Sequence, residues 1–67
     1  MDPRVEALHV ERARLLKLPH GSRYAQHRLR QVERALQLAT AICESPAQPN
    51  VVSLTEELDN LLAELHL

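Results

Sequence analysis

Residues 23–44, RYAQHRLRQVERALQLATAICE, decide the fold of this 67-residue chain. Apolar residues recur in this stretch at alternating intervals of four and three, which places them on one side of an α-helix for about three heptads. They are Ala25, Leu29, Val32, Leu36, Ala39 and Cys43. In the second half of the stretch the apolar surface also takes in Ala35, Leu38, Ala41 and Ile42. A helix that is apolar over so much of its circumference is predicted to contact neighbours on two sides.

A shorter helix is predicted upstream of this stretch. Pro3 suits the first position of a helix, because the N–H that proline lacks has no intrahelical partner there, and Asp2 is placed to cap the remaining free N–H groups. Pro19 disfavours helical geometry in the residue before it, so the helix should end near Leu18. Ser22 is the predicted cap of the long helix that follows.

Another helix is predicted downstream. Residues 45–50, SPAQPN, contain two prolines and are typical of a linker. Ser53 and Glu56 have the spacing of a capping box, in which the serine and the glutamate satisfy two free backbone N–H groups. The predicted helices are therefore 3–18, 23–44 and 54–66, with a linker over 45–52.

Short connections favour antiparallel neighbours, so the predicted architecture is a small all-α three-helix bundle in a single domain, residues 1–67. The first two helices form an antiparallel hairpin, and the third, shorter helix returns along the second. The charge pattern agrees with this arrangement. All eight Lys and Arg residues lie in the first 34 positions, whereas residues 35–67 contain only acidic charges. The acidic third helix is therefore expected to face the basic part of the second.

The core of such a bundle is thin. The chain has thirteen leucines, no Phe or Trp, and Tyr24 as its single aromatic residue. One cysteine, Cys43, forms no disulfide within the chain, so stability is expected to come partly from self-association or from a partner. A lone cysteine without an apolar leader also favours a reducing, intracellular location, cytoplasmic or nuclear.

Residues 58–65, LDNLLAEL, fit the pattern Leu-Asp-x-Leu-Leu-x-x-Leu. This stretch resembles the LD motif of paxillin-like adaptor proteins, short amphipathic helices that dock in grooves of helical-bundle domains. The resemblance implies that Leu58, Leu61, Leu62 and Leu65 fill a groove on a partner while Asp59 meets a basic residue on its rim. The alternative is that the same leucines form the core of this chain's own bundle.

The predicted function is that of a helical protein-interaction or adaptor module that binds a partner helix or a helical groove. The residues predicted to form the partner surface are Leu54, Leu58, Asp59, Leu61, Leu62, Leu65, Leu36, Leu38 and Ile42. One alternative is a structural homodimer of hairpins closed along the seam of residues 25–43. A second alternative is helix-turn-helix-like nucleic-acid binding through the basic residues Arg23, Arg28, Arg30 and Arg34.

Catalytic and metal-binding signatures are not found in the sequence. Gly21 is the only glycine, so there is no Gly-rich phosphate loop, and the four histidines and Cys43 do not have the spacing of a metal site. No segment is long and apolar enough to suggest a membrane span. The sequence therefore predicts a protein that is not an enzyme, with no cofactor, metal, membrane contact or small-molecule substrate.

Overall fold

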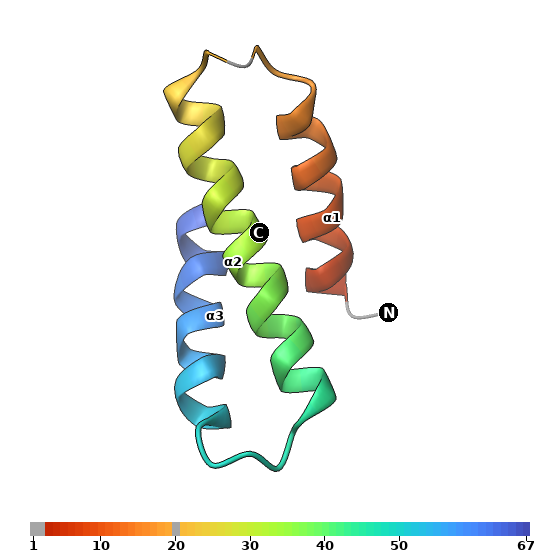
Figure 1. The fold of residues 1–67 in the computed structure, drawn as a ribbon, viewed down its shortest axis with the longest axis vertical. Coiled ribbons are helices and arrows are strands. Elements are labelled where there is room, and N and C mark those ends of the chain that lie inside the picture. The colour runs from red at the N-terminus through yellow and green to blue at the C-terminus, as the bar shows by residue number, and fades with distance from the viewer. Residues whose placement is uncertain (1–2, 20) are drawn as a thin grey trace.

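The computed structural model describes residues 3–19 and 21–67, and this part of the chain forms three α-helices and no strand. They are α1 (Pro3–Leu16), α2 (Arg23–Glu44) and α3 (Val51–Leu65). α2 is central, and α1 and α3 run antiparallel to it on either side (Figure 1). In the described residues, α1 and α3 both pack along α2, but their backbones do not approach each other. The predicted all-α three-helix bundle is confirmed.

One side of α2 faces α3. Gln31 donates a hydrogen bond to Glu64 (2.8 Å), and one turn further along, Arg34 donates to Glu57 (2.9 Å). Leu38 follows on the same face, since residues three or four apart are neighbours on a helix. The acidic third helix therefore lies beside the basic part of α2, as the charge pattern predicts.

A second side of α2 faces α1. Glu33 pairs with Arg12 of α1 at 3.5 Å. Two half-buried leucines lie on this side, because they are spaced three or four residues from Glu33. They are Leu29, four residues before it, and Leu36, three residues after it. α2 thus has a neighbour on each of two sides, which explains why its apolar surface is wider than a single heptad seam.

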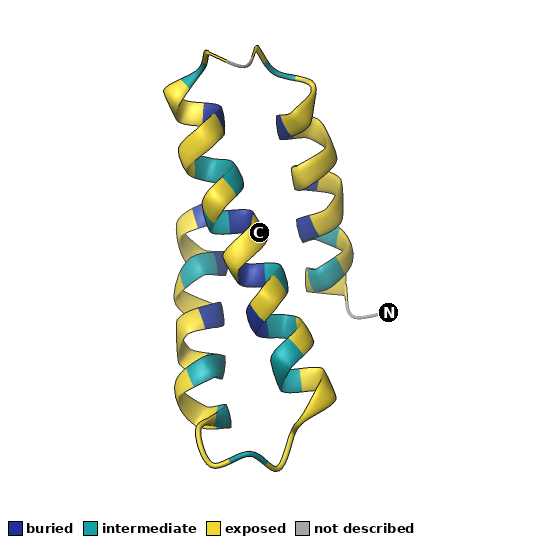
Figure 2. Ribbon diagram, viewed as in Figure 1, coloured by how far each residue is buried: buried dark blue, intermediate teal, exposed yellow. Residues whose placement is uncertain are grey.

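The core is built from small and aliphatic residues of all three helices (Figure 2). Its buried members are Leu8, Leu15, Ala25, Val32, Ala35, Leu38, Leu58, Leu62 and Leu65. The only aromatic residue, Tyr24, is not among them, and 60% of its surface is exposed. The expectation of a thin core without aromatic side chains is therefore confirmed.

Local signals set the ends of the first two helices. The Ser22 hydroxyl accepts a hydrogen bond from the Ala25 N–H (3.2 Å), so the predicted cap of α2 is confirmed. α1 ends at Leu16, two residues earlier than predicted, and the N–H groups of Lys17 and Leu18 donate to carbonyls three residues back. This tighter turn completes the helix before Pro19. The predicted cap at Asp2 lies outside the described residues.

The predicted start of α3 is wrong by three residues. The helix begins at Val51, and its first backbone hydrogen bond runs from the Leu54 N–H to the Asn50 carbonyl (3.0 Å). Ser53 therefore lies within the first turn, and it does not form the predicted capping box with Glu56. Val51 is half-buried and lies seven residues before Leu58, on the same face of the helix. This apolar contact favours an earlier start than the cap signal predicts.

α3 ends at Leu65, and the next residue, His66, has the left-handed conformation (φ 59°). The His66 N–H donates to the Ala63 carbonyl (3.2 Å) and the Leu67 N–H to the Leu62 carbonyl (3.0 Å). These two bonds form a Schellman motif, which satisfies carbonyls that the helix end would otherwise leave free. Glycine usually occupies the left-handed position, so a histidine there adds local strain.

Candidate interaction surface

The residues predicted to bind a partner differ widely in exposure. Leu58, Leu62 and Leu65 of α3 and Leu38 of α2 are buried. Four others are half-buried: Leu54 and Leu61 in α3, and Leu36 and Ile42 in α2. Asp59 is exposed, and one of its oxygens accepts a hydrogen bond from Arg4 of α1 (3.1 Å).

These residues do not form one continuous surface. The leucines of the LD-like stretch face α2 and supply part of the core. Leu36 and Leu38 lie on different sides of α2, toward α1 and α3 respectively. Leu65 is fully buried, and Leu58 and Leu62 expose only 6% and 5% of their surface, so a partner could engage the whole leucine stripe of α3 only if α3 moved away from α2, which would expose the core.

Toward one end of the molecule a half-buried arginine joins all three helices. Arg28 of α2 donates a hydrogen bond to the Leu65 carbonyl at the end of α3 (2.7 Å) and a longer one to Glu11 of α1 (3.5 Å). The side chains of Arg28 and Glu11 are only 16% and 11% exposed. Arg14 also donates to Glu11 through its Nε (2.9 Å), so this carboxylate has two cationic partners.

The surroundings of Glu11 favour its charged form. Hydrogen bonding from Arg14, and to a lesser degree from Arg28, holds the pKa of Glu11 below its ordinary value, although burial of the carboxyl opposes this shift. Glu11 in turn, and after it the Tyr24 hydroxyl, raises the pKa of Arg14. Among the described residues, every buried side-chain nitrogen and oxygen has a hydrogen-bond partner. The cluster therefore stabilises the junction of the helices and presents no free reactive group.

At the other end the bundle is open. The α2–α3 hairpin extends past Pro3, the first residue of α1 (Figure 1). A groove of about 590 Å³ lies there, between the start of α1, the last turns of α2 and the middle of α3. Its lining is mainly apolar: Val5, Leu8, Ala39, Ile42, Cys43, Leu58 and Leu62, with Arg4, Thr40, Glu44 and Thr55 at polar positions. We call this the hairpin groove.

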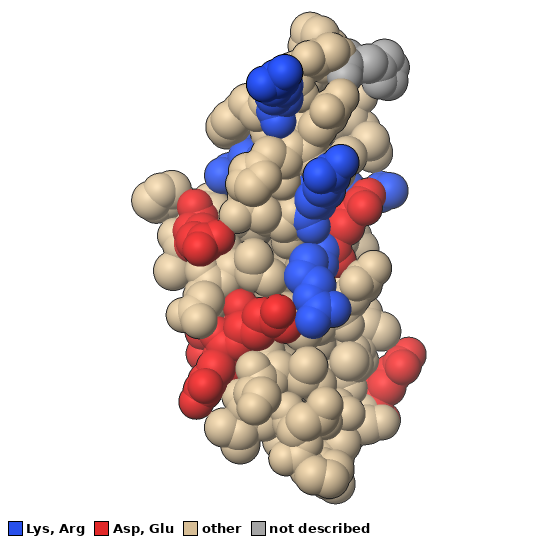
Figure 3. Space-filling view, turned by 60° about the vertical axis from the view of Figure 1, so that its left-hand side comes forward, with Lys and Arg blue, Asp and Glu red and all other residues tan. Residues whose placement is uncertain are grey.

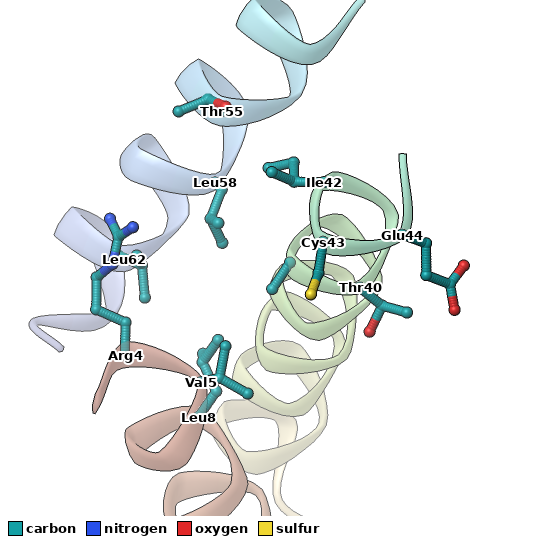
Figure 4. Close-up of a pocket in the computed structure, with 11 residues that line it drawn as sticks. Arg4, Val5, Leu8, Thr40, Ile42, Cys43, Glu44, Thr55, Leu58 and Leu62 are labelled. Atoms are coloured by element: carbon teal, nitrogen blue, oxygen red, sulfur yellow. The ribbon is translucent and has the colours of Figure 1, made fainter. Parts of the chain in front are cut away.

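Side chains from three helices point into the hairpin groove. Figure 4 shows Val5 and Leu58 directed toward a shared space, with Cys43 beside it on α2. Cys43 is a free, exposed thiol. Ile42 is the one residue of the predicted partner surface that is half-buried and also lines the groove. The groove thus offers apolar surface that is open to solvent without any movement of α3.

The basic residues of α2 divide into two groups. Arg28 and Arg34 are engaged with α1 and α3, as described above. Arg23 and Arg30 are exposed and take part in no ion pair among the described residues. Basic and acidic side chains lie side by side on the face that includes α2 and α3 (Figure 3). This face is therefore not a continuous basic surface of the kind that binds nucleic acid.

No group of three or more His, Cys, Asp or Glu side chains is placed to hold a metal ion in the part of the chain that the structure describes. None of the helices over the described ranges combines the length and hydropathy needed to cross a membrane.

Comparison with known proteins adds no assignment, since no family model, no curated protein and no solved structure matches this chain.

Proposed function

We propose that this chain is a small helical protein-interaction module and that the hairpin groove is its binding surface. The observation that carries the proposal is a groove of about 590 Å³ in which three helices present apolar side chains to solvent. In so small a chain, apolar surface left uncovered is a strong driving force for association, since its burial is favourable in proportion to area.

The edge of the hairpin groove suggests the chemistry of its ligand. Glu44 lines the groove, and Asp59 lies beside it on α3 with Arg4 as its partner. Glu56 is exposed on α3 near the same end of the molecule, and Glu6 is exposed in the first turn of α1. An apolar segment flanked by basic residues would fill the groove and meet this acidic edge.

This proposal differs from docking through the leucine stripe of α3. Binding through the whole stripe would first require Leu58, Leu62 and Leu65 to leave the core, at a cost comparable to the stability of the whole domain. Binding in the hairpin groove requires no such opening. The burial of these leucines therefore favours binding in the hairpin groove over docking through the whole stripe.

The test uses a synthetic amphipathic helical peptide with leucines on one face and lysines at both ends. Because Cys43 lines the groove and is the only cysteine, bound peptide should slow its alkylation by iodoacetamide. Ile42→Glu places a charge in the groove and should weaken peptide binding at least tenfold, a loss of about 1.4 kcal/mol. Val10→Glu alters an exposed apolar residue outside the groove and is the matched control.

Far-UV circular dichroism would establish that both variants are folded before binding is compared. Slower alkylation of Cys43 and a selective effect of Ile42→Glu would support the groove. Peptide binding that leaves the alkylation rate of wild-type Cys43 unchanged would overturn the proposal, and that result does not depend on any variant folding.

A further inference from the structure

Three cations that form no ion pair among the described residues lie in the half of the bundle remote from the hairpin groove. Lys17 lies in the turn after α1, while Arg23 and Arg30 lie in the first half of α2. All three are exposed, and none of them takes part in an ion pair among the described residues.

Three acids that form no ion pair among the described residues lie at the level of the hairpin groove. Glu6 is in the first turn of α1, Glu44 is the last residue of α2, and Glu56 is in the second turn of α3. The antiparallel arrangement of the helices brings these positions to the half of the molecule that holds the groove, with Glu6 nearest the middle because the α2–α3 hairpin extends past the start of α1 (Figure 1). These charges are therefore separated along the long axis, with the basic ones in one half of the molecule and the acidic ones in the other.

Exposed apolar side chains accompany the cations. Leu16 is 50% exposed at the end of α1, and Tyr24 is 60% exposed at the start of α2. Leu16 follows Val5 by eleven residues, about three turns, and Tyr24 precedes Ile42 by eighteen, which is five turns. On each helix, the exposed residue and the groove-lining residue therefore lie on the same side.

We propose that the occupant of the hairpin groove is a second copy of this chain, docked antiparallel to the first. The end that carries Leu16 and Tyr24 in each copy covers the groove of the other, and the three cations of each copy face the three acids of its partner. The proposal rests on the proposed function, because it names the partner of the same groove.

Symmetry explains why the assembly closes as a dimer. A contact between two different ends of a molecule generates an open filament unless a two-fold axis makes both contacts at once. The groove and the end that carries Leu16 and Tyr24 lie on a common side of each copy. Two antiparallel copies can therefore make both contacts at once, so that both grooves are filled. The thin core of the chain also gains apolar contacts in this way.

Charge reversal at each end provides a sharp test. The first variant carries Glu44→Lys and Glu56→Lys, so both of its ends are basic. The second carries Lys17→Glu and Arg23→Glu, so both of its ends are acidic. All four positions are exposed, so the variants should fold like the wild type, which circular dichroism would check. The molar mass of each is measured by light scattering over a roughly hundredfold range of concentration at low salt.

The wild type should form dimers, and each variant alone should dissociate at a concentration at least tenfold higher than the wild type does. An equimolar mixture of the two variants should restore a dimer, because each contact then joins opposite charges. A wild type that stays monomeric over the whole range would overturn the proposal, as would a mixture that is no more associated than its components. If the monomeric chain still bound the lysine-flanked peptide, the groove would be a site for another protein, which separates failure of this proposal from failure of the proposed function.

Discussion

Replacement of Arg28 by methionine should destabilise the bundle far more than the same replacement at an exposed arginine. Methionine retains most of the apolar stem and removes the guanidinium group. The Leu65 carbonyl then loses its donor at 2.7 Å, and Glu11 keeps only Arg14 as a cationic partner. Arg28 is the side chain of α2 that hydrogen-bonds to both α1 and α3.

The magnitude follows from the burial of the contact. A hydrogen bond to a charged group contributes about 1.5–3 kcal/mol when its partner would be left unsatisfied. Arg28 is 16% exposed, so water partly replaces the lost donor, and we expect a cost of about 2 kcal/mol. The core of a chain this short supplies roughly 3–5 kcal/mol of stability, so the substitution should remove about half of it. For a domain of this size the melting temperature should fall by roughly 8–16 °C.

The assay is thermal and urea unfolding followed by far-UV circular dichroism, at a protein concentration low enough to keep the chain monomeric. Arg30→Met is the matched control, because Arg30 lies on the same helix but is exposed and makes no ion pair among the described residues. The control should change the free energy of unfolding by less than about 0.5 kcal/mol. Equal stabilities of Arg28→Met and Arg30→Met would contradict this expectation, since Arg28 would then contribute no more to the stability of the bundle than an exposed arginine does.

Three smaller perturbations test other parts of the structure. The pKa of Glu11 is lowered on folding, so its contribution to stability is present above its ordinary value of 4.5 and is lost as the pH falls through the lowered pKa; Glu11→Gln should flatten this part of the acid-unfolding profile, and an unchanged profile would contradict the assignment. His66→Gly should raise the free energy of unfolding by about 0.5–1 kcal/mol, because glycine adopts the left-handed conformation without strain; a lower melting temperature would contradict this. Ser22→Ala should lower the free energy of unfolding by about 1 kcal/mol through loss of the cap on α2, whereas Ser53→Ala should leave it nearly unchanged. A larger loss for Ser53→Ala than for Ser22→Ala would indicate that Ser53 does form the predicted capping box.

The fold could be predicted because local and long-range signals agree in α2. Its apolar pattern indicated two neighbours, and Ser22 has the backbone and side-chain geometry of a cap. The start of α3 could not be predicted in the same way. A cap signal at Ser53 competes there with burial of Val51, and the packing that decides between them is visible only when α3 is placed against α2.

The candidate site could be predicted only in part. The sequence indicated apolar surface on α2 and α3, and Ile42, Leu58 and Leu62 do line the hairpin groove. Val5 and Cys43 were not predicted to take part, because the groove arises where the α2–α3 hairpin extends past the start of α1. The bridge from Arg28 to Glu11 was also missed, because seventeen residues separate the two and no periodicity relates positions on different helices. The feature that marks Arg28 is its half-buried position among the exposed arginines of α2, which only the structure shows.

The rate at which iodoacetamide alkylates Cys43, measured across a roughly hundredfold range of protein concentration, shows whether this chain associates through the hairpin groove or through the whole leucine stripe of α3. Cys43 lines the groove and is exposed in the single chain, so its alkylation reports whether the groove is covered. If the chain associates through the groove, we expect the rate to fall severalfold as dimers form. A rate that stays constant while light scattering records an increase in mass would contradict it, because association would then leave the groove open.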